Sequence, residues 1–249
     1  MYLGIDLGSR TVKMAVWDGE RLLAHEIVES GFEPHRQAEK MLSAYRPTAV
    51  VATGYGRHLA ADYFADSVIT EIKAHAIGIA HHFPECTTLV DVGGQDSKVI
   101  ALNDKGKVTT FQMNDKCAAG TGRFLEIMAG SLAFTLEEFG AEALQARQEV
   151  QINSMCTVFA ESEVISMKNR GIPRRHIARA VHASVVDRLA GMLARLGYGD
   201  MVAFSGGVAR NPCIVAMLTE KLPEARLVVP QLPDITGALG AALHAAKVA

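Results

Sequence analysis

A pattern of strand, acidic residue, glycine turn and second strand occurs twice in the sequence, about 85 residues apart. In the first copy an apolar strand ends at Asp6 and Gly8 follows; in the second, a strand ends at Asp91 before Gly93 and Gly94. Backbone N–H groups in such turns can bind phosphate oxygens, and a neighbouring acid can reach a bound magnesium ion. Two such turns facing each other would hold the β- and γ-phosphates of a nucleotide. The repeat therefore predicts a nucleotide-binding protein.

The hypothesis assigns three groups of residues to the nucleotide. In the first turn, the expected contacts to phosphate and metal are Asp6, Gly8, Ser9, Arg10, Thr11 and Lys13. In the second, Gly93, Gly94 and Gln95 are expected to contact phosphate, and either Gln95 or Asp96 would orient the attacking water. The predicted catalytic set is Asp6, Asp91 and Gln95. Further on, Gly206 and Gly207 offer a flat surface free of side chains for an adenine or ribose, with Asn211 as a neighbour.

Composition limits the class of protein. A length of 249 residues suits one large domain or two lobes, which we divide at 1–113 and 114–249, with the final helix able to pack back on the first lobe. Hydrophobic residues make up 49% and aromatic residues 6%, which is typical of an α/β enzyme. A net charge of −2 excludes a general attraction to nucleic acid or anionic membranes. We find no apolar stretch of membrane-spanning length and no signal peptide, and so expect a cytoplasmic protein.

Four cysteines in a chain without export signals favour reduced thiols, metal binding or redox chemistry. Cys117 lies in a loop of small residues just before an apolar-periodic segment, and Cys156 opens another helix-like run. A position before a helix N-terminus favours an anionic sulfur, because unpaired N–H groups and the helix dipole are found there. The alternative is that both cysteines are small buried hydrophobic residues. Cys86 and Cys213 are interpreted as packing residues.

The motifs resemble known families at two levels. Segments 4–9, 91–96 and 205–208 occur in the order phosphate 1, phosphate 2 and adenosine, and resemble the actin/hexokinase/Hsp70 ATPase superfamily. The resemblance implies an actin-like, ribonuclease H-like α/β fold with two lobes around a nucleotide cleft. Segments 114–122 and 155–163 are similar to the ATPases that activate 2-hydroxyacyl-CoA dehydratases. Related subunits occur in benzoyl-CoA reductases and in reductases of double-cubane iron–sulfur proteins.

The narrower resemblance implies a cofactor and a mechanism. In that family one [4Fe–4S] cluster is held at a homodimer interface by two cysteines from each subunit, and Cys117 and Cys156 match those positions. The helices after these cysteines would point their N-termini at the cluster. An electron from ferredoxin or flavodoxin would pass to an iron–sulfur enzyme, driven by binding and hydrolysis of ATP to ADP with Mg²⁺. The acceptor stays open among a dehydratase, a benzoyl-CoA reductase-like enzyme and a double-cubane protein.

Two other functions fit part of the pattern. A sugar or small-metabolite kinase of the same superfamily explains the three nucleotide motifs but leaves the paired cysteine loops unexplained. A filament- or scaffold-type ATPase is a third class. Neither alternative needs iron, so iron content distinguishes both from an electron donor.

Overall fold

The computed structural model describes residues 1–153 and 156–249, so Met155 of the second cysteine motif lies outside the described residues. The chain forms two compact units that interleave along the sequence. Unit 1 comprises Met1–Leu89, Ile100–Thr110 and Pro230–Ala249, and unit 2 comprises Val90–Val99 and Phe111–Val229. The division expected at 113/114 differs from this, because Val90, Val92 and Val99 are buried in the hydrophobic core of unit 2.

Unit 1 contains a five-stranded sheet in the order β3-β2-β1-β4-β5. Its strands are β1 (Tyr2–Leu7), β2 (Thr11–Trp17), β3 (Leu22–Glu29), β4 (Ala49–Thr53) and β5 (Ser67–Val68). β1 pairs antiparallel with β2 and parallel with β4, so Asp6 lies in register with Lys13 on one side and with Thr53 on the other. This register places three side chains of different chemistry at one end of the sheet.

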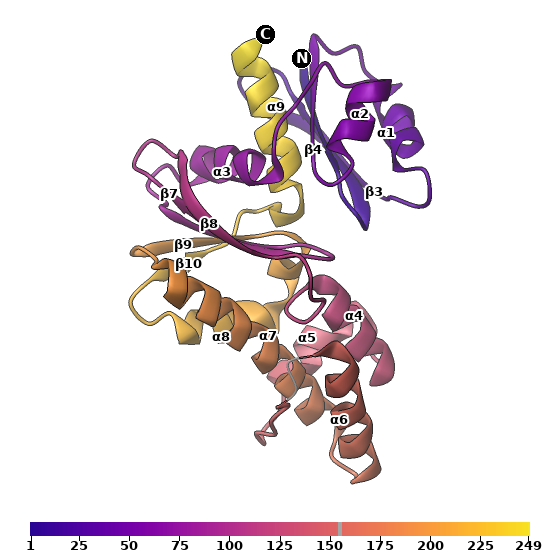
Figure 1. The fold of residues 1–249 in the computed structure, drawn as a ribbon, viewed down its shortest axis with the longest axis vertical. Helices are drawn as coiled ribbons and strands as arrows, with labels where there is room; N and C mark the ends of the chain where they lie inside the picture. The colour runs from indigo at the N-terminus through magenta and orange to yellow at the C-terminus, as the bar shows by residue number, and fades with distance from the viewer. Residues whose placement is uncertain (154–155) are drawn as a thin grey trace. The chain divides into compact units, whose positions relative to one another are not determined.

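The helices of unit 1 pack on this sheet or on one another. They are α1 (Pro34–Leu42), α2 (Arg57–Tyr63), α3 (Glu71–His82) and the final helix α9 (Thr236–Val248), which follows the short 3₁₀ turn η2 (Pro233–Ile235). α9 packs against β1, β2 and β4 and against α3, as Figure 1 shows. Most of its buried residues are Gly and Ala, so backbones approach closely with few bulky side chains between them.

The second sheet has the order β10-β9-β6-β7-β8. Its strands are β6 (Thr88–Val92), β7 (Ser97–Leu102), β8 (Val108–Asn114), β9 (Met201–Ser205) and β10 (Arg226–Val228). Taken in the opposite direction, this order matches that of the first sheet strand for strand. The duplication seen in the two glycine turns therefore extends to the whole strand order. The boundary between the units runs through β6, β7 and β8.

Unit 2 is largely helical. Its helices are α4 (Gly122–Ser131), α5 (Leu136–Leu144), α6 (Thr157–Asn169), α7 (Arg174–Leu196), the 3₁₀ turn η1 (Gly207–Arg210) and α8 (Pro212–Lys221). Their starts follow local chemistry: Pro173 precedes α7, and Thr135 and Glu138 form a capping box at α5. No helix among residues 1–153 and 156–249 is long and apolar enough to cross a membrane.

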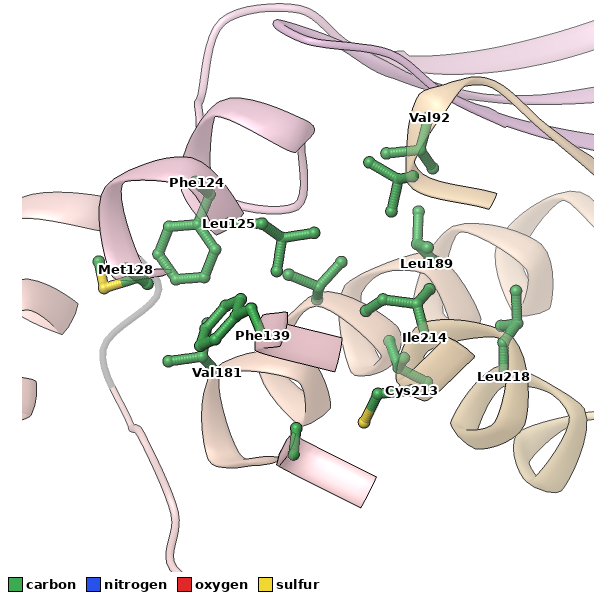
Figure 2. Close-up of a cluster of buried hydrophobic side chains, with 14 of the residues drawn as sticks. Val92, Phe124, Leu125, Met128, Phe139, Val181, Leu189, Cys213, Ile214 and Leu218 are labelled. Atoms are coloured by element: carbon green, nitrogen blue, oxygen red, sulfur yellow. The ribbon is translucent and has the colours of Figure 1, made fainter. Parts of the chain in front are cut away.

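A single hydrophobic cluster holds these helices together. Figure 2 shows Phe124 and Met128 of α4 beside Phe139 of α5 and Val181 of α7, with Ile214 of α8 in the same cluster. All five side chains are buried, and burying each contributes about 1.5–3 kcal/mol relative to exposure. The segments before α4 and α8, which carry the sequence-predicted site residues, are therefore anchored by well-packed helices.

Candidate functional site

The first glycine turn joins β1 to β2 in unit 1. The Gly8 N–H donates to the Thr11 carbonyl at 3.1 Å and closes the turn. Asp6 is only 2% exposed, and its Oδ2 pairs with Lys13 Nζ at 2.9 Å. The other carboxylate oxygen, Oδ1, is buried without a hydrogen-bond partner among the residues that the structure describes. A buried carboxylate oxygen without a partner destabilises the fold unless a ligand binds it. The turn therefore fits a magnesium ion or a metal-bound water at Oδ1.

The other residues assigned to this turn lie at its tip. Ser9 and Arg10 are exposed, and Thr11 is half-buried. The Arg10 guanidinium lies 3.8 Å from Glu29 Oε1, but both side chains are well exposed, so this pair contributes little. Ser9 and Arg10 are therefore accessible to an anionic ligand.

The end of β4 encloses Asp6 from the neighbouring strand. Gly54 has a φ of +88°, and a side chain there would collide with Asp6 Oδ1 and with the Leu7 carbonyl. Only glycine combines this left-handed conformation with such close approach. Thr53, directly before it, is fully buried, and its hydroxyl finds no hydrogen-bond partner in the described chain. Sequence reasoning missed Thr53; the available signal was a hydroxyl residue at the end of a buried strand.

The second glycine turn has the same construction in unit 2. The Gly93 N–H donates to the Asp96 carbonyl at 3.0 Å. Lys98 is 1% exposed, and its Nζ lies 2.8 Å from Asp96 Oδ1 and 3.4 Å from Asp91 Oδ2. A buried lysine between two carboxylates offsets one of their two negative charges. Sequence reasoning missed Lys98, although a lysine follows the acid at the same spacing in both copies of the repeat.

This arrangement separates the two candidates for orienting water. The Asp96 carboxylate is buried and paired with Lys98, whereas the Gln95 side chain is exposed at the tip of the turn. Gln95 is thus the accessible polar side chain of the two. Asp91 is also held from the neighbouring strand, because the Ser205 hydroxyl donates to its Oδ1 at 3.0 Å.

The predicted adenosine segment follows β9. Gly206 has a φ of +86°, and a Cβ there would lie 2.8 Å from Asp91 Oδ1, so its backbone packs against the second acid as Gly54 packs against the first. Gly207 opens η1, and Asn211 caps α8 by accepting from the N–H groups of Cys213 and Ile214. The Asn211 side chain is therefore used locally, and its contact with a nucleoside stays a prediction.

A buried histidine fixes Asn211 from α7. His182 Nδ1 donates to the Ala178 carbonyl at 2.7 Å, so its Nε2 is the acceptor for Asn211 Nδ2 at 2.9 Å. Phe139 packs on the imidazole, with ring centroids 4.5 Å apart. Burial lowers the pKa of His182 from 6.5 to about 4, which keeps the ring neutral and able to accept this bond.

The two cysteines predicted to bind a cluster are the accessible ones. Cys156 is exposed at the N-cap of α6, and Cys117 is half-buried in the loop before α4. By contrast, Cys86 and Cys213 are buried, as expected of packing residues, and burial raises the pKa of the Cys213 thiol to about 11. Two accessible thiols per chain fit half of the four thiolates that a [4Fe–4S] cluster needs.

Hydrogen bonds shape the loop of Cys117. Asn114 Nδ2 lies 3.0 Å from both the Cys117 and the Ala119 carbonyls, and the Thr121 hydroxyl donates to the Ala118 carbonyl. These bonds fold the loop back on the end of β8. The Cys117 backbone is therefore held in a defined conformation rather than left to solvent.

The N-terminus of α4 is bonded to the second glycine turn. The Gly122 N–H donates to the Gly93 carbonyl at 2.9 Å, and the Arg123 N–H donates to the Gly94 carbonyl at 2.8 Å. The sequence-based hypothesis expected the first amides of α4 to point at the iron–sulfur cluster. Two of them instead donate to carbonyls of the predicted phosphate turn. The small size of Gly122 permits this contact, because a Cβ there would lie 3.0 Å from the Gly93 carbonyl oxygen.

The second cysteine region is tied to its own helix. Glu163 Oε2 accepts from the Asn153 N–H at 2.9 Å, which fixes the end of the described segment before Cys156. Glu161 accepts from the Ser131 hydroxyl at 3.3 Å and so links α6 to the end of α4. Beyond Cys156, the apolar side chains Val158 and Phe159 are 67% and 65% exposed.

Comparison with known proteins tests the sequence-based hypothesis. Residues 3–245 match the model of the BadF/BadG/BcrA/BcrD ATPase family. An activator of lactoyl-CoA dehydratase from Anaerotignum propionicum is 45% identical over 256 residues, which cover 99% of this chain and 98% of that protein. The solved activator of the 2-hydroxyisocaproyl-CoA dehydratase from Clostridium difficile, with bound ADPNP, is 41% identical with a TM-score of 0.92 and covers 99% of this chain and 95% of that one.

More distant structures share the fold alone. A ROK family glucokinase from Streptomyces griseus, in complex with glucose and AMPPNP, is 14% identical with a TM-score of 0.62, and the match covers 99% of each chain. The predicted actin-like α/β fold and the predicted family are both confirmed. With a model matched over nearly its whole length and a relative at 45% identity, the chain belongs to the BadF/BadG/BcrA/BcrD ATPase family.

Proposed function

We propose that this protein is an ATP-hydrolysing activator that donates a low-potential electron to an iron–sulfur enzyme, with a 2-hydroxyacyl-CoA dehydratase as the preferred acceptor. The carrying observation is that the loop of an accessible cysteine, Cys117, is joined through α4 to a predicted phosphate turn. Relatives at 41–45% identity are activators of such dehydratases, which supports this choice of acceptor. Ferredoxin or flavodoxin is the proposed electron donor.

The nucleotide would be bound by both turns, through backbone N–H groups other than those of Gly8 and Gly93, which close the turns. We assign phosphate contacts to Gly8–Thr11 and to Gly93–Gln95, and nucleoside contacts to Gly206 and Gly207. Backbone amides at such turns bind phosphate oxygens without a large cost in side-chain ordering. A relative with bound ADPNP supports ATP as the ligand. Asp6 Oδ1 is the proposed acceptor for Mg²⁺ or for one of its waters, and Lys13 holds the opposite oxygen of the same carboxylate.

Hydrolysis needs a water molecule aligned with the γ-phosphate rather than a strong base. Gln95 suits this role because its side chain is exposed and carries both a donor and an acceptor. Asp91 has a different proposed role. Its carboxylate is held by Ser205 and Lys98, so it fixes the base of the turn from which Gln95 projects.

The cysteines supply half of a cluster site, so two chains are required. We propose that Cys117 and Cys156 of each chain bind one shared [4Fe–4S] cluster at a homodimer interface. When bound, such a cluster would serve as a one-electron carrier. The exposed apolar residues that follow Cys156, Val158 and Phe159, favour a second copy of the chain as their cover.

The coupling of ATP to electron transfer would pass through two hydrogen bonds. When the Gly93–Gly94 turn shifts with its bound phosphate, the N–H groups of Gly122 and Arg123 must follow or break their bonds. The Cys117 loop leads directly into the N-terminus of α4. A shift of the Gly93–Gly94 turn would therefore move this helix end and, with it, the Cys117 loop. No comparable device is needed by a kinase that transfers a phosphoryl group to a free substrate.

A kinase function is not favoured. The glucokinase likeness is at 14% identity and concerns the fold alone. A kinase would also leave the paired thiols, their loops and the exposed apolar start of α6 without a role.

The deciding experiment is iron and sulfide analysis with visible spectroscopy on protein purified or reconstituted without oxygen. We expect about four irons per dimer, lost in Cys117→Ser and in Cys156→Ser but kept in the control Cys86→Ser. The loaded protein should then activate a 2-hydroxyacyl-CoA dehydratase only with ATP and a low-potential reductant. Protein without iron under these conditions, with ATPase activity stimulated by a sugar, would overturn the proposal and favour the kinase.

A further inference from the structure

Unit 1 contains two buried polar atoms at the ends of adjacent strands, and both lack a partner in the described chain. They are Asp6 Oδ1 on β1 and Thr53 Oγ1 on β4, and the two residues are in direct register across the parallel pair. Thr53 is 0% exposed and Asp6 is 2% exposed. An unsatisfied buried polar group destabilises the folded protein, because it has lost its hydrogen bonds to water. Two of them side by side indicate a site that is completed by a ligand.

The duplicated unit shows how the same two positions behave when the hydroxyl and the carboxylate bond to each other. In unit 2 the corresponding strand ends carry Asp91 and Ser205, and the Ser205 hydroxyl donates directly to Asp91 Oδ1 at 3.0 Å. Each hydroxyl residue is followed by a glycine with left-handed φ, +88° at Gly54 and +86° at Gly206, so the backbones match. The difference between the units is therefore in the hydroxyl–carboxylate bond and not in the local fold.

The two oxygens of Asp6 have different surroundings. Its Oδ2 is bonded to Lys13, and a Cβ at Gly237 would lie 3.6 Å from Oδ2, so that oxygen is enclosed. Oδ1 packs against Gly54 at the end of β4, where any side chain would collide with it, and it has no hydrogen-bond partner in the described chain. A carboxylate oxygen only accepts, whereas the Thr53 hydroxyl both donates and accepts. A water molecule, which has two donors and two acceptors, can hydrogen-bond to Asp6 Oδ1 and to the Thr53 hydroxyl at the same time.

We propose that Thr53 is a positioning residue of the metal–nucleotide site, whose hydroxyl and Asp6 Oδ1 together hold a water of the Mg²⁺ hydration shell. This inference rests on the proposed function, because it assumes that the first turn binds a magnesium nucleotide. Mg²⁺ keeps several of its waters when it binds with phosphates and one carboxylate, so such a water is an expected feature of the loaded site. Thr53 would thereby favour MgADP over metal-free ADP without contacting the nucleotide.

The test is calorimetric titration of the full-length protein with ADP, in Mg²⁺ and in EDTA. Thr53→Val removes the hydroxyl at nearly constant volume and should weaken MgADP binding about tenfold, the loss of one hydrogen bond. ADP binding in EDTA should change by less than about twofold on the same grounds. Thr53→Ser, which restores a hydroxyl, should recover most of the MgADP affinity. Thr88→Val removes another buried strand hydroxyl of unit 1 and should leave both affinities near wild type.

Several outcomes contradict the inference. Equal weakening in Mg²⁺ and EDTA would assign Thr53 to packing alone, and wild-type MgADP affinity in Thr53→Val would remove it from the site. Failure of Thr53→Ser to recover binding would also exclude a role for the hydroxyl. These results leave the proposed function intact, because wild-type protein still binds MgADP. Absence of any adenine nucleotide binding by the wild type would overturn both the inference and the proposed function.

Discussion

At the scale of single residues, two buried acids occupy equivalent positions in the two units. Asp6 and Asp91 are both buried at strand ends, each with a lysine that follows at the same spacing. One difference between their surroundings is that Asp91 accepts from the Ser205 hydroxyl, whereas Asp6 keeps an unsatisfied oxygen. The same acid position can thus be bonded within the protein in one unit and keep an oxygen for a ligand in the other.

His182 leads to a pH-dependent prediction at this scale. Its pKa is lowered to about 4 in the folded protein, so between about pH 6.5 and about pH 4 the unfolded chain binds more protons. Stability therefore falls as pH falls through this window, by about 3 kcal/mol. His182→Gln keeps a hydrogen-bonding side chain but no titrating group. Denaturant unfolding between about pH 7 and about pH 4 should show a loss in the wild type that is about 3 kcal/mol larger than in the variant.

Parallel stability curves for the wild type and His182→Gln would contradict this assignment. They would mean that the imidazole takes up its proton without breaking the bond to Asn211. Both proteins share the other groups that titrate in this range. The contributions of those groups to the pH dependence of stability therefore cancel in the difference.

At the scale of elements, the N-terminus of α4 joins the two kinds of motif. Its first amides are bonded to Gly93 and Gly94, and the loop before it carries Cys117. This contact depends on Gly122, because a Cβ at that position would lie only 3.0 Å from the Gly93 carbonyl oxygen. At the other end of the same helix, a Cβ at Gly130 would meet no atom within 4 Å.

This difference defines a matched pair of variants. Gly122→Ala should push the Gly93–Gly94 turn away, weaken ADP binding severalfold and uncouple the Cys117 loop from nucleotide. Gly130→Ala adds the same methyl group where space is open and should stabilise α4 by up to about 1 kcal/mol without either effect. The measurement is the alkylation rate of Cys117 in cluster-free protein, with and without MgADP. We expect the nucleotide to change this rate in the wild type and in Gly130→Ala, and to change it much less in Gly122→Ala.

If Gly122→Ala responded to MgADP as Gly130→Ala does, the hydrogen bonds at the N-terminus of α4 would not be the route of coupling. Nucleotide binding and cysteine accessibility would then have to be linked elsewhere in unit 2.

At the scale of the whole molecule, one chain has an incomplete set of ligands for the proposed cluster. Two accessible thiols per chain require a second chain, and α6 presents apolar side chains beside one of them. Large exposed apolar residues next to a functional cysteine are typical of a surface that is covered in the assembly. In a twofold symmetric interface each substitution acts twice.

Phe159→Glu should therefore disrupt the proposed dimer. Losing a buried phenylalanine costs about 1.5–3 kcal/mol per copy, so two copies should weaken association on the order of a thousandfold. Analytical ultracentrifugation would measure the change, and iron content should fall with it. Leu23→Glu, at an exposed leucine of β3 in unit 1, is the control and should keep both the dimer and the iron. A Phe159→Glu protein that stays dimeric with a full cluster would exclude this face of α6 from the interface.

Much of the local structure could be predicted from the sequence, because local chemistry specifies it. From caps, prolines and apolar periodicity we predict helices at 71–82, 157–169 and 174–196, and the structure has these bounds. The two acid–glycine turns and the distinction between accessible and buried cysteines were equally readable. Strand ends are less readable: the apolar run predicts a strand from Val99, whereas β7 begins at Ser97, because cross-strand pairing and not propensity sets its start.

The sequence by itself determined the elements, the duplicated turns and the family to which they point. Only the tertiary structure decided that Lys98 is buried between two acids, that Thr53 lies in register with Asp6, and that α4 begins on the second glycine turn. It also decided that the units interleave, so that no single cut separates them. The physical reason is that each of these features joins segments far apart in the chain. Strand register, burial and ion pairing depend on which segments meet, and local sequence carries little information about that.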